Sequence, residues 1–215
     1  MPIVQAIFQC IRPQCHFRFP AYELKNPDVI RCPRCGSATR MVENPYPSME
    51  VPNHQTASPL PLLFALLDNI RSAHNVGSIF RTADGAGFSK LFLCGVTPTP
   101  DHPKVGKTAL GAEYALSWSQ YPDSLEAFVE IQTLGCVFWA LEGGENSTSL
   151  YELLPVQATR PICLILGNEV TGIDPGLLVK CERVVHLPML GVKHSLNVSI
   201  AFGISAYSLR FGKQI

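Results

Sequence analysis

Residues 187–210, LPMLGVKHSLNVSIAFGISAYSLR, decide the fold of the C-terminal part of this chain. The opening LPM ends the β-branched run Val184-Val185, and Gly191 allows a sharp turn before a polar segment. Apolar residues then recur at roughly helical spacing, so the pattern predicts a strand end, a tight loop and a helix. Ser195 stands at the expected N-cap of that helix, because its hydroxyl can accept a hydrogen bond from a free amide. On its own, this pattern is typical of a capped core helix.

Two upstream segments have the same order of an apolar strand followed by a polar loop. Residues 62–67 precede DNIRSAHNVGSIFRTADGAG at 68–87, and residues 162–166 precede GNEVTG at 167–172. Open α/β sheets place ligands at the carboxyl ends of their strands. We therefore expect the polar loops to face a ligand site.

The three segments together resemble the SpoU/TrmH-type branch of the SPOUT methyltransferases. The first contains N-x-R-x-x-x-N-x-G-x-x-x-R-T-A from Asn69, the second L-G-x-E-x-x-G from Leu166, and the third LPM-x-G followed by SLNVS. The resemblance implies a homodimer that methylates a ribose 2′-hydroxyl of tRNA or rRNA, with S-adenosylmethionine as the methyl donor. The motifs recognise ribose and cofactor, so they do not choose between tRNA and rRNA.

Strands alternate with helices from residue 62 to the end, and most strands are continuous apolar runs. This pattern predicts an α/β domain with a mostly parallel sheet covered on both faces. The resemblance implies in addition a deep C-terminal trefoil knot. A Rossmann-type methyltransferase or dehydrogenase is disfavoured, because no G-x-G-x-x-G follows an N-terminal strand. Further strands are expected at 91–94, 115–121, 136–141 and 184–187, and a helix at 124–134 with Ser124 as its cap.

The resemblance also implies two sets of site residues. On the acceptor side they are Arg81, Asn75, Glu169, Ser195 and Asn197. The cofactor-binding set is Leu141, Glu142, Gly167, Leu187, Met189 and Leu196. A guanidinium stays protonated and only donates hydrogen bonds, so we expect Arg81 to stabilise negative charge developing on the 2′-oxygen. The alternatives are a surface arginine for Arg81, helix capping for Ser195 and loop stapling for Asn197.

Two glycines and one long loop complete the expected site. Gly77 is expected to let backbone approach closely near a helix start, and Gly167 to leave room for a ligand. Residues 95–113, GVTPTPDHPKVGKTALGAE, are proline-rich and carry Lys104 and Lys107. Since long loops in compact domains are often functional, we interpret this one as facing the substrate.

The first 42 residues contain two cysteine pairs, C-x4-C at Cys10 and Cys15 and C-P-R-C-G at Cys32 and Cys35. Thiolate pairs on short turns suit tetrahedral zinc, and so small a segment needs a metal to fold. We expect a zinc-ribbon-like domain over residues 1–42 that holds a structural zinc ion. Disulfides are the alternative, and His16 is a potential substitute ligand. Basic and aromatic residues suit an RNA-facing module, although Phe17 and Phe19 could simply pack the ribbon: Arg12, Phe17, Arg18, Phe19, Arg31 and Arg34.

The proline-rich stretch 43–61 reads as a linker, which leaves 62–215 as the methyltransferase-like domain. A length of 215 residues with 47% hydrophobic content suffices for one substantial core and a small appendage. Without an apolar run of 18 residues or a signal peptide, we expect a soluble cytoplasmic protein with neither a membrane nor a DNA partner. The scattered cysteines Cys94, Cys136, Cys163 and Cys181 read as reduced core residues.

The net charge of zero is unevenly distributed. Residues 1–50 hold six Lys or Arg against four Asp or Glu, whereas residues 51–215 hold eleven against thirteen. An RNA partner would therefore have to meet a local basic patch, the N-terminal domain or a surface completed by a second subunit. The alternative function is a non-catalytic RNA- or ribosome-binding protein that retains the SPOUT fold.

Overall fold

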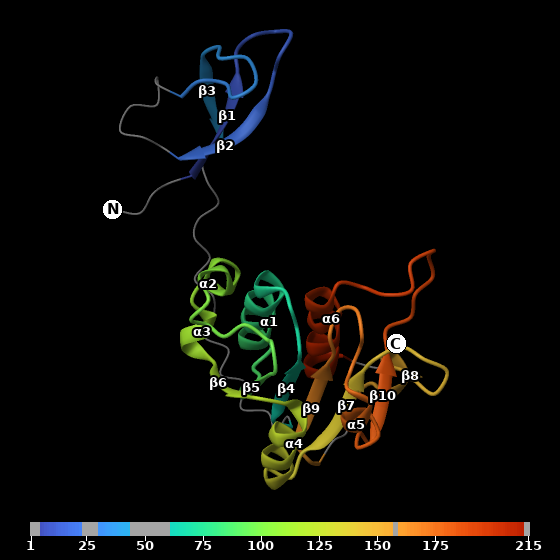
Figure 1. Ribbon diagram of the computed structural model, residues 1–215. Helices are drawn as coiled ribbons and strands as arrows, with labels where there is room; N and C mark the ends of the chain where they lie inside the picture. The colour runs from blue at the N-terminus through green and yellow to red at the C-terminus, as the bar shows by residue number, and fades with distance from the viewer. Residues whose placement is uncertain (1–4, 23–29, 44–60, 157–158, 213–215) are drawn as a thin grey trace. The chain divides into compact units, whose positions relative to one another are not determined.

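The computed structural model describes residues 5–22, 30–43, 61–156 and 159–212. The chain divides into two compact units, Met1–Ala57 and Ser58–Ile215, and Figure 1 labels the elements of each. We call the first the ribbon unit and the second the larger unit. Most of the expected linker, residues 44–60, lies outside the described residues, so its assignment stays a prediction.

The ribbon unit contains a three-stranded antiparallel sheet in the order β2-β1-β3. The register places Phe8 of β1 opposite Phe19 of β2 and Met41 of β3. Phe8 is buried, but Met41 is 46% exposed, so the apolar contribution to this unit's stability is small. The strands are β1 Gln5–Cys10, β2 Arg18–Tyr22 and β3 Thr39–Glu43.

The larger unit contains a seven-stranded sheet in the order β6-β5-β4-β9-β7-β10-β8. Every strand pair described in this sheet is parallel. The central strands β4 and β9 consist of buried apolar residues apart from Asp68, which ends β4. The strands are β4 Leu63–Asp68, β5 Lys90–Cys94, β6 Ser117–Tyr121, β7 Val137–Leu141, β8 Thr148–Ser149, β9 Ile162–Leu166 and β10 Arg183–His186.

Helices cover both faces of this sheet, because alternate residues of each central strand point to opposite sides. Leu63 and Leu67 belong to the core cluster that includes Phe80 of α1 and Phe202 of α6. Leu66 belongs to the other cluster, which includes residues of α4 and α5. The helices are α1 Ala73–Gly85, α2 Pro103–Ala109, α3 Ala112–Ala115, α4 Ser124–Thr133, a 3₁₀-helix Leu150–Leu153, α5 Pro175–Leu178 and α6 Val198–Phe211.

The predicted α/β class, parallel sheet and strand positions are confirmed, with strand ends within one or two residues of those expected. The knot implied by the resemblance stays a prediction. Cys94, Cys136 and Cys163 are buried and unpaired, and Cys181 is half-buried, as expected for core cysteines. None of the helices in the described ranges is long and apolar enough to cross a membrane.

Two predicted helix caps are wrong. Asp123, and not Ser124, caps α4, because its carboxylate accepts a hydrogen bond from the Glu126 amide at 2.8 Å. Asn197, and not Ser195, caps α6, and its Oδ1 accepts from the Ser199 amide at 2.9 Å. In both cases the side-chain oxygen of a neighbouring residue, and not the serine hydroxyl, accepts the hydrogen bond from a free amide in the first turn of the helix.

The segment 95–113 is not the long loop that its prolines suggested. It contains α2 and α3, with His102 as the N-cap of α2 and Pro103 in its first turn. Proline is well tolerated there, because the amide that it lacks would have no partner within the helix. A proline-rich composition is therefore compatible with a helix when the proline stands in its first turn.

Candidate functional site

A pocket of about 730 Å³ opens at the carboxyl ends of β7, β9 and β10. Polar loop residues and apolar side chains contribute to its walls, and all of them belong to the larger unit. The six residues expected to bind a cofactor all line it: Leu141, Glu142, Gly167, Leu187, Met189 and Leu196. The structure thus brings this set together at one end of the sheet, and the binding role itself stays a prediction.

The loop after β9 forms one wall of this pocket and is closed tightly on itself. Asn168 and Gly172 exchange backbone hydrogen bonds of 3.0 and 2.9 Å. A Cβ at Gly167 would lie 2.3 Å from backbone atoms of Gly172 and Ile173. Glycine is therefore required at 167 by the loop's own packing, whereas the sequence interpretation had attributed it to room for a ligand.

Two carboxylates fix the position of this loop relative to the neighbouring strands. Oε2 of Glu142, which follows β7, accepts a hydrogen bond from the Ile173 amide at 3.1 Å. Asp68, only 1% exposed, accepts from the Asp174 amide at 2.8 Å and from the Asn69 side chain at 2.9 Å. Sequence reasoning missed Asp68, although a carboxylate that ends an otherwise apolar strand is a signal of such a role.

A chain of hydrogen bonds joins all three sequence motifs beside the pocket. Nδ2 of Asn75 on α1 donates to Oε1 of Glu169 at 3.1 Å, and Nδ2 of Asn197 donates to Oδ1 of Asn75 at 3.1 Å. The backbone amide of Arg71 donates to the second carboxylate oxygen of Glu169, also at 3.1 Å. Three residues expected on the acceptor side, Asn75, Glu169 and Asn197, therefore form one contiguous network.

The environment of Glu169 favours its charged form. Partial burial raises the pKa of this carboxyl, but hydrogen bonds from the Arg71 amide, its own amide and the Asn75 side chain outweigh that effect. The pKa of Glu169 therefore lies below its ordinary value. The carboxylate is an acceptor that holds Asn75 in a single orientation near neutral pH.

The other two acceptor-side residues differ in their placement. Ser195 is exposed and lines the pocket together with Glu169 and Asn197. Arg81 is exposed on α1 and is not among the pocket-lining residues. It lies six residues beyond Asn75, roughly 9 Å along the helix axis. Within one chain, the structure does not bring Arg81 to the network.

Gly77 is required by helix packing. A Cβ there would lie 2.2 Å from both Oγ1 of Thr108 and the carbonyl oxygen of Val105, which belong to α2. The Thr108 hydroxyl donates to the carbonyl oxygen of His74 on α1 at 3.0 Å. The close backbone approach expected at Gly77 is therefore the approach of α2.

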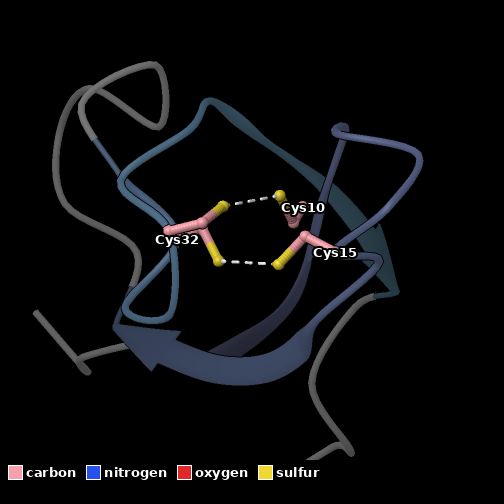
Figure 2. A group of neighbouring side chains, drawn as sticks. Cys10, Cys15 and Cys32 are labelled. Carbon is pink, nitrogen blue, oxygen red and sulfur yellow. Dashed lines mark hydrogen bonds between the residues drawn. The ribbon is translucent and has the colours of Figure 1, made fainter.

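The four N-terminal cysteines form a compact cluster in the ribbon unit (Figure 2). Their sulfur atoms all lie within 4.8 Å of one another, with 3.6 Å between Cys10 and Cys35 and 3.8 Å between Cys15 and Cys32. Disulfide sulfurs would be about 2.05 Å apart. Four thiolates around zinc, with Zn–S bonds of about 2.3 Å, place neighbouring sulfurs about 3.8 Å apart. The donor set fits a tetrahedral zinc ion, and His16 is not part of it.

The two cysteine turns are built alike. The Cys10 amide donates to the Phe17 carbonyl and the Cys32 amide to the Ser37 carbonyl, both at 2.9 Å. In each case the residue after the second cysteine has a left-handed conformation, with φ of 45° at His16 and 70° at Gly36. Hydrogen bonds from Ser37 lower the pKa of Cys35 to about 6.

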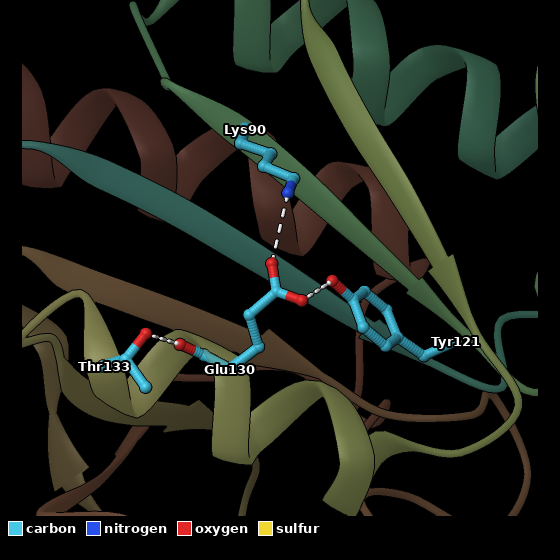
Figure 3. Close-up of polar contacts among 4 residues, drawn as sticks. All are labelled: Lys90, Tyr121, Glu130 and Thr133. Carbon is cyan, nitrogen blue, oxygen red and sulfur yellow. Dashed lines mark hydrogen bonds and ion pairs between the residues drawn. The ribbon is translucent and has the colours of Figure 1, made fainter.

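A polar cluster on the opposite side of the sheet from α6 has a structural role (Figure 3). Glu130 of α4 accepts from the Tyr121 hydroxyl and forms an ion pair with Lys90 at 3.5 Å. Burial and the hydrogen bond to Glu130 raise the pKa of Tyr121 to about 12. Since these residues tie α4 to β5 and β6 and line no described pocket, we assign them no catalytic part.

Comparison with known proteins places this geometry in a family. Residues 62–207 match the SpoU rRNA Methylase family. A tRNA (guanosine(18)-2′-O)-methyltransferase of Thermus thermophilus is 31% identical over 67% of this chain and 72% of its own length. A 23S rRNA (guanosine-2′-O-)-methyltransferase of Haemophilus ducreyi is 29% identical over 77% of this chain and 65% of its own length.

A solved structure agrees with this assignment. The AdoMet-bound rRNA methyltransferase of Sinorhizobium meliloti superposes with a TM-score of 0.63 at 28% identity, over 69% of this chain and 56% of that one. The chain thus spans little more than half the length of that relative. The family model matches about two thirds of the chain, and the three sequence motifs meet beside the pocket. The chain therefore belongs to the SpoU rRNA Methylase family.

Proposed function

We propose that this chain transfers a methyl group from S-adenosylmethionine to a ribose 2′-hydroxyl of tRNA or rRNA. The observation that carries the proposal is the hydrogen-bonded chain Glu169–Asn75–Asn197, which links the three motifs beside the pocket. The relatives named above methylate guanosine riboses, one in tRNA and one in 23S rRNA. They support the reaction class and leave both RNA classes open as substrates.

The pocket suits the methyl donor in size and chemistry. Its volume of about 730 Å³ is typical of cofactor sites. Leu187, Met189 and Leu196 offer apolar surface for the adenine ring, and the loops at Glu142 and Gly167 offer backbone donors and acceptors. When bound there, S-adenosylmethionine supplies an electrophilic methyl group on a sulfonium sulfur.

The network beside the pocket would hold the acceptor ribose. The Glu169 carboxylate fixes the Asn75 amide, which in turn fixes the Asn197 amide at the start of α6. Ser195 presents an exposed hydroxyl in the same pocket, where it can hydrogen bond a ribose oxygen. These groups orient the 2′-oxygen, and positioning of this kind removes much of the barrier to transfer.

We infer that Arg81 acts in the pocket of a second subunit and not in the pocket of its own chain. Ile200, Tyr207 and Phe211 are 54%, 48% and 58% exposed and share one face of α6. A Cβ added at Gly85 of α1 would lie 2.9 Å from the Tyr207 hydroxyl, so α1 packs beside this face of α6 at Gly85. Arg81 lies one turn before Gly85 on α1, and it therefore lies alongside the apolar face. A homodimer formed through the face would bring Arg81 to a second subunit, where its guanidinium would stabilise the developing 2′-oxyanion.

Mixing two inactive variants tests the shared site. Arg81→Ala and Glu169→Ala homodimers should each lose methyl transfer, whereas subunits exchanged between them should recover about a quarter of the wild-type rate. Sedimentation should show a dimer that Ile200→Asp dissociates. No recovery from a mixture proven to contain heterodimers would place Arg81 in its own subunit's site.

The ribbon unit would bind zinc through Cys10, Cys15, Cys32 and Cys35 in a structural role. All four ligand positions of a tetrahedral ion are taken by sulfur, and this leaves none for a substrate. Metal analysis of the purified chain should give one zinc ion per chain. A chain with intact thiols that folds fully without metal would refute the assignment.

The reaction is tested with methyl-labelled S-adenosylmethionine and separate pools of tRNA and rRNA that lack the modification. Label should enter the ribose of one pool, and Arg81→Ala should reduce transfer by at least about 100-fold while cofactor binding persists. Arg183→Ala is the matched control, because Arg183 is also exposed and does not line the pocket. Binding of RNA without any transfer would favour the non-catalytic alternative.

A further inference from the structure

We propose that the ribbon unit is a second RNA-binding surface, which grips an unpaired segment of the substrate through its arginines and the exposed ring of Phe17. The inference rests on the proposed function, because it takes RNA as the substrate. The described residues that line the methyl-transfer pocket belong to the larger unit.

The charge of the ribbon complements a phosphate backbone. The described residues of the ribbon, 5–22 and 30–43, contain five arginines against one acidic residue, Glu43, and residues 1–50 as a whole hold six Lys or Arg against four Asp or Glu. Residues 51–215, by contrast, hold eleven basic against thirteen acidic side chains. Neutralisation of phosphates by Lys and Arg supplies most of the nonspecific affinity of proteins for nucleic acids. The ribbon is therefore the part of this chain best suited to bind a phosphate backbone.

Strand register and turn geometry hold these arginines in place. Gln9 of β1 pairs with Arg18 on one side and Arg40 on the other, so the two arginines share one face of the sheet. Arg12 and Arg34 are exposed and lie within the two cysteine turns. Arginines at these positions can contact successive phosphates of a nucleic-acid backbone.

The aromatic residues add a surface for bases. Buried Phe8 stacks on Phe19 with ring centroids 6.4 Å apart, and Phe19 stacks on Phe17 at 5.9 Å. Phe17 ends this series and is 38% exposed, so part of its ring is open to solvent. An exposed aromatic ring beside arginines is the combination that binds unpaired nucleotides, whose bases stack on the ring.

Tethering explains the advantage for methylation. Both units belong to one chain, so RNA held by the ribbon is present at a raised effective concentration for the larger unit. Loss of the ribbon surface should therefore weaken RNA binding and raise the KM for RNA, while kcat and cofactor affinity stay unchanged.

The test uses the full zinc-loaded chain and a labelled single-stranded RNA, with binding followed by fluorescence anisotropy at several salt concentrations. Phe17→Leu should weaken binding roughly tenfold, whereas Phe17→Tyr, which keeps an aromatic ring, should bind like wild type. The double variant Arg12→Gln with Arg34→Gln should reduce the slope of log affinity against log salt by about 1.4. The matched double replacement by lysine should keep that slope.

Zinc content and the melting temperature of each variant show whether its ribbon is folded. If Phe17→Leu loses zinc, the comparison of RNA binding uses the Arg12→Gln, Arg34→Gln double variant instead. RNA affinity unchanged in the zinc-loaded variants, alongside normal methyl transfer, would overturn the ribbon proposal and leave the proposed function standing. Ribbon-dependent RNA binding by a chain that transfers no methyl group would support the ribbon proposal and overturn the proposed function. A wild-type chain that binds no RNA would overturn both.

Discussion

The two units of this chain reach a stable fold by different means. The larger unit buries two apolar clusters, one on each face of a seven-stranded parallel sheet. In the described part of the ribbon, the buried residues are Ala6, Phe8, Cys10 and Cys32, and two of these are cysteines of the sulfur cluster. Burial of apolar surface suffices for the larger unit, whereas the proposed zinc ion would supply most of the ribbon's stability.

The difference extends to function. In the larger unit, polar residues lie at a pocket beyond the ends of buried strands, and hydrogen bonds between their side chains fix their orientation. In the ribbon, exposed arginines and one partly exposed aromatic ring accompany a cluster of four cysteine sulfurs. A rigid core is suited to precise chemistry, and a small metal-stabilised sheet is suited to presenting a binding surface.

The largest expected effect separates the two sources of stability. Cys32→Ala should abolish zinc binding and unfold the ribbon completely, because the metal supplies most of its folding free energy. Melting of the larger unit should be unchanged. Hydrogen exchange resolved by segment, together with metal analysis, would record both.

Cys163→Ala is the matched control in the larger unit. Cys163 is completely buried in β9, so the change should cost about 1–2 kcal/mol of the larger unit's stability and leave zinc content intact. Equal effects of the two substitutions on both units would show that the units are not independent.

The next effect concerns the network in the larger unit. Asn197→Asp keeps the Oδ1 acceptor that caps α6 but loses the Nδ2 donor to Asn75. We expect nearly wild-type stability with methyl transfer reduced by about 100-fold. If transfer is lost only with Asn197→Ala, which also removes the cap and costs about 1 kcal/mol, Asn197 acts by capping alone.

Helix packing gives an effect of intermediate size. Gly77→Ala places a methyl group 2.2 Å from Thr108 and Val105 and should destabilise the larger unit by about 1–3 kcal/mol. Gly203→Ala in α6 meets only an ordinary 3.8 Å contact with Thr82 and should be neutral or slightly stabilising. Urea denaturation of both variants compares them, and similar midpoints would contradict the packing of α2 on Gly77.

The smallest effect is a pH dependence at Glu169. Its pKa is lowered in the folded chain, so its contribution to stability is complete above the ordinary value of about 4.3. That contribution is lost as the pH falls through the lowered value. Carboxyl NMR of the folded chain should therefore show Glu169 titrating below an exposed glutamate, and Asn75→Ala should move its pKa upward. Titration at or above the ordinary value would contradict the hydrogen bonds described.

Sequence reasoning worked best where a pattern determines position directly. Apolar runs located β4 and β9, and the family resemblance assigned Asn75, Glu169 and Asn197 to the acceptor side, where the structure joins them in one network. It failed where two neighbours compete for one role, as at the caps of α4 and α6, because only geometry decides which oxygen reaches the free amides.

Two further features could not be read from sequence because they depend on packing. Gly167 was attributed to ligand access, but the loop after β9 is what approaches it, and the close backbone approach expected at Gly77 is made by α2. Arg81 was expected on the acceptor side together with Asn75, yet it lies about a turn and a half further along an exposed helix face. Its proposed role depends on a second subunit, which one chain's sequence does not position.

The division of labour between the units is tested most directly by steady-state methyl transfer with RNA as the varied substrate. We predict that Glu169→Ala lowers kcat with little change in the KM for RNA, whereas Phe17→Leu raises that KM with kcat unchanged. The reverse pattern, or the same loss of kcat in both variants, would contradict the assignment of chemistry to the larger unit and RNA capture to the ribbon.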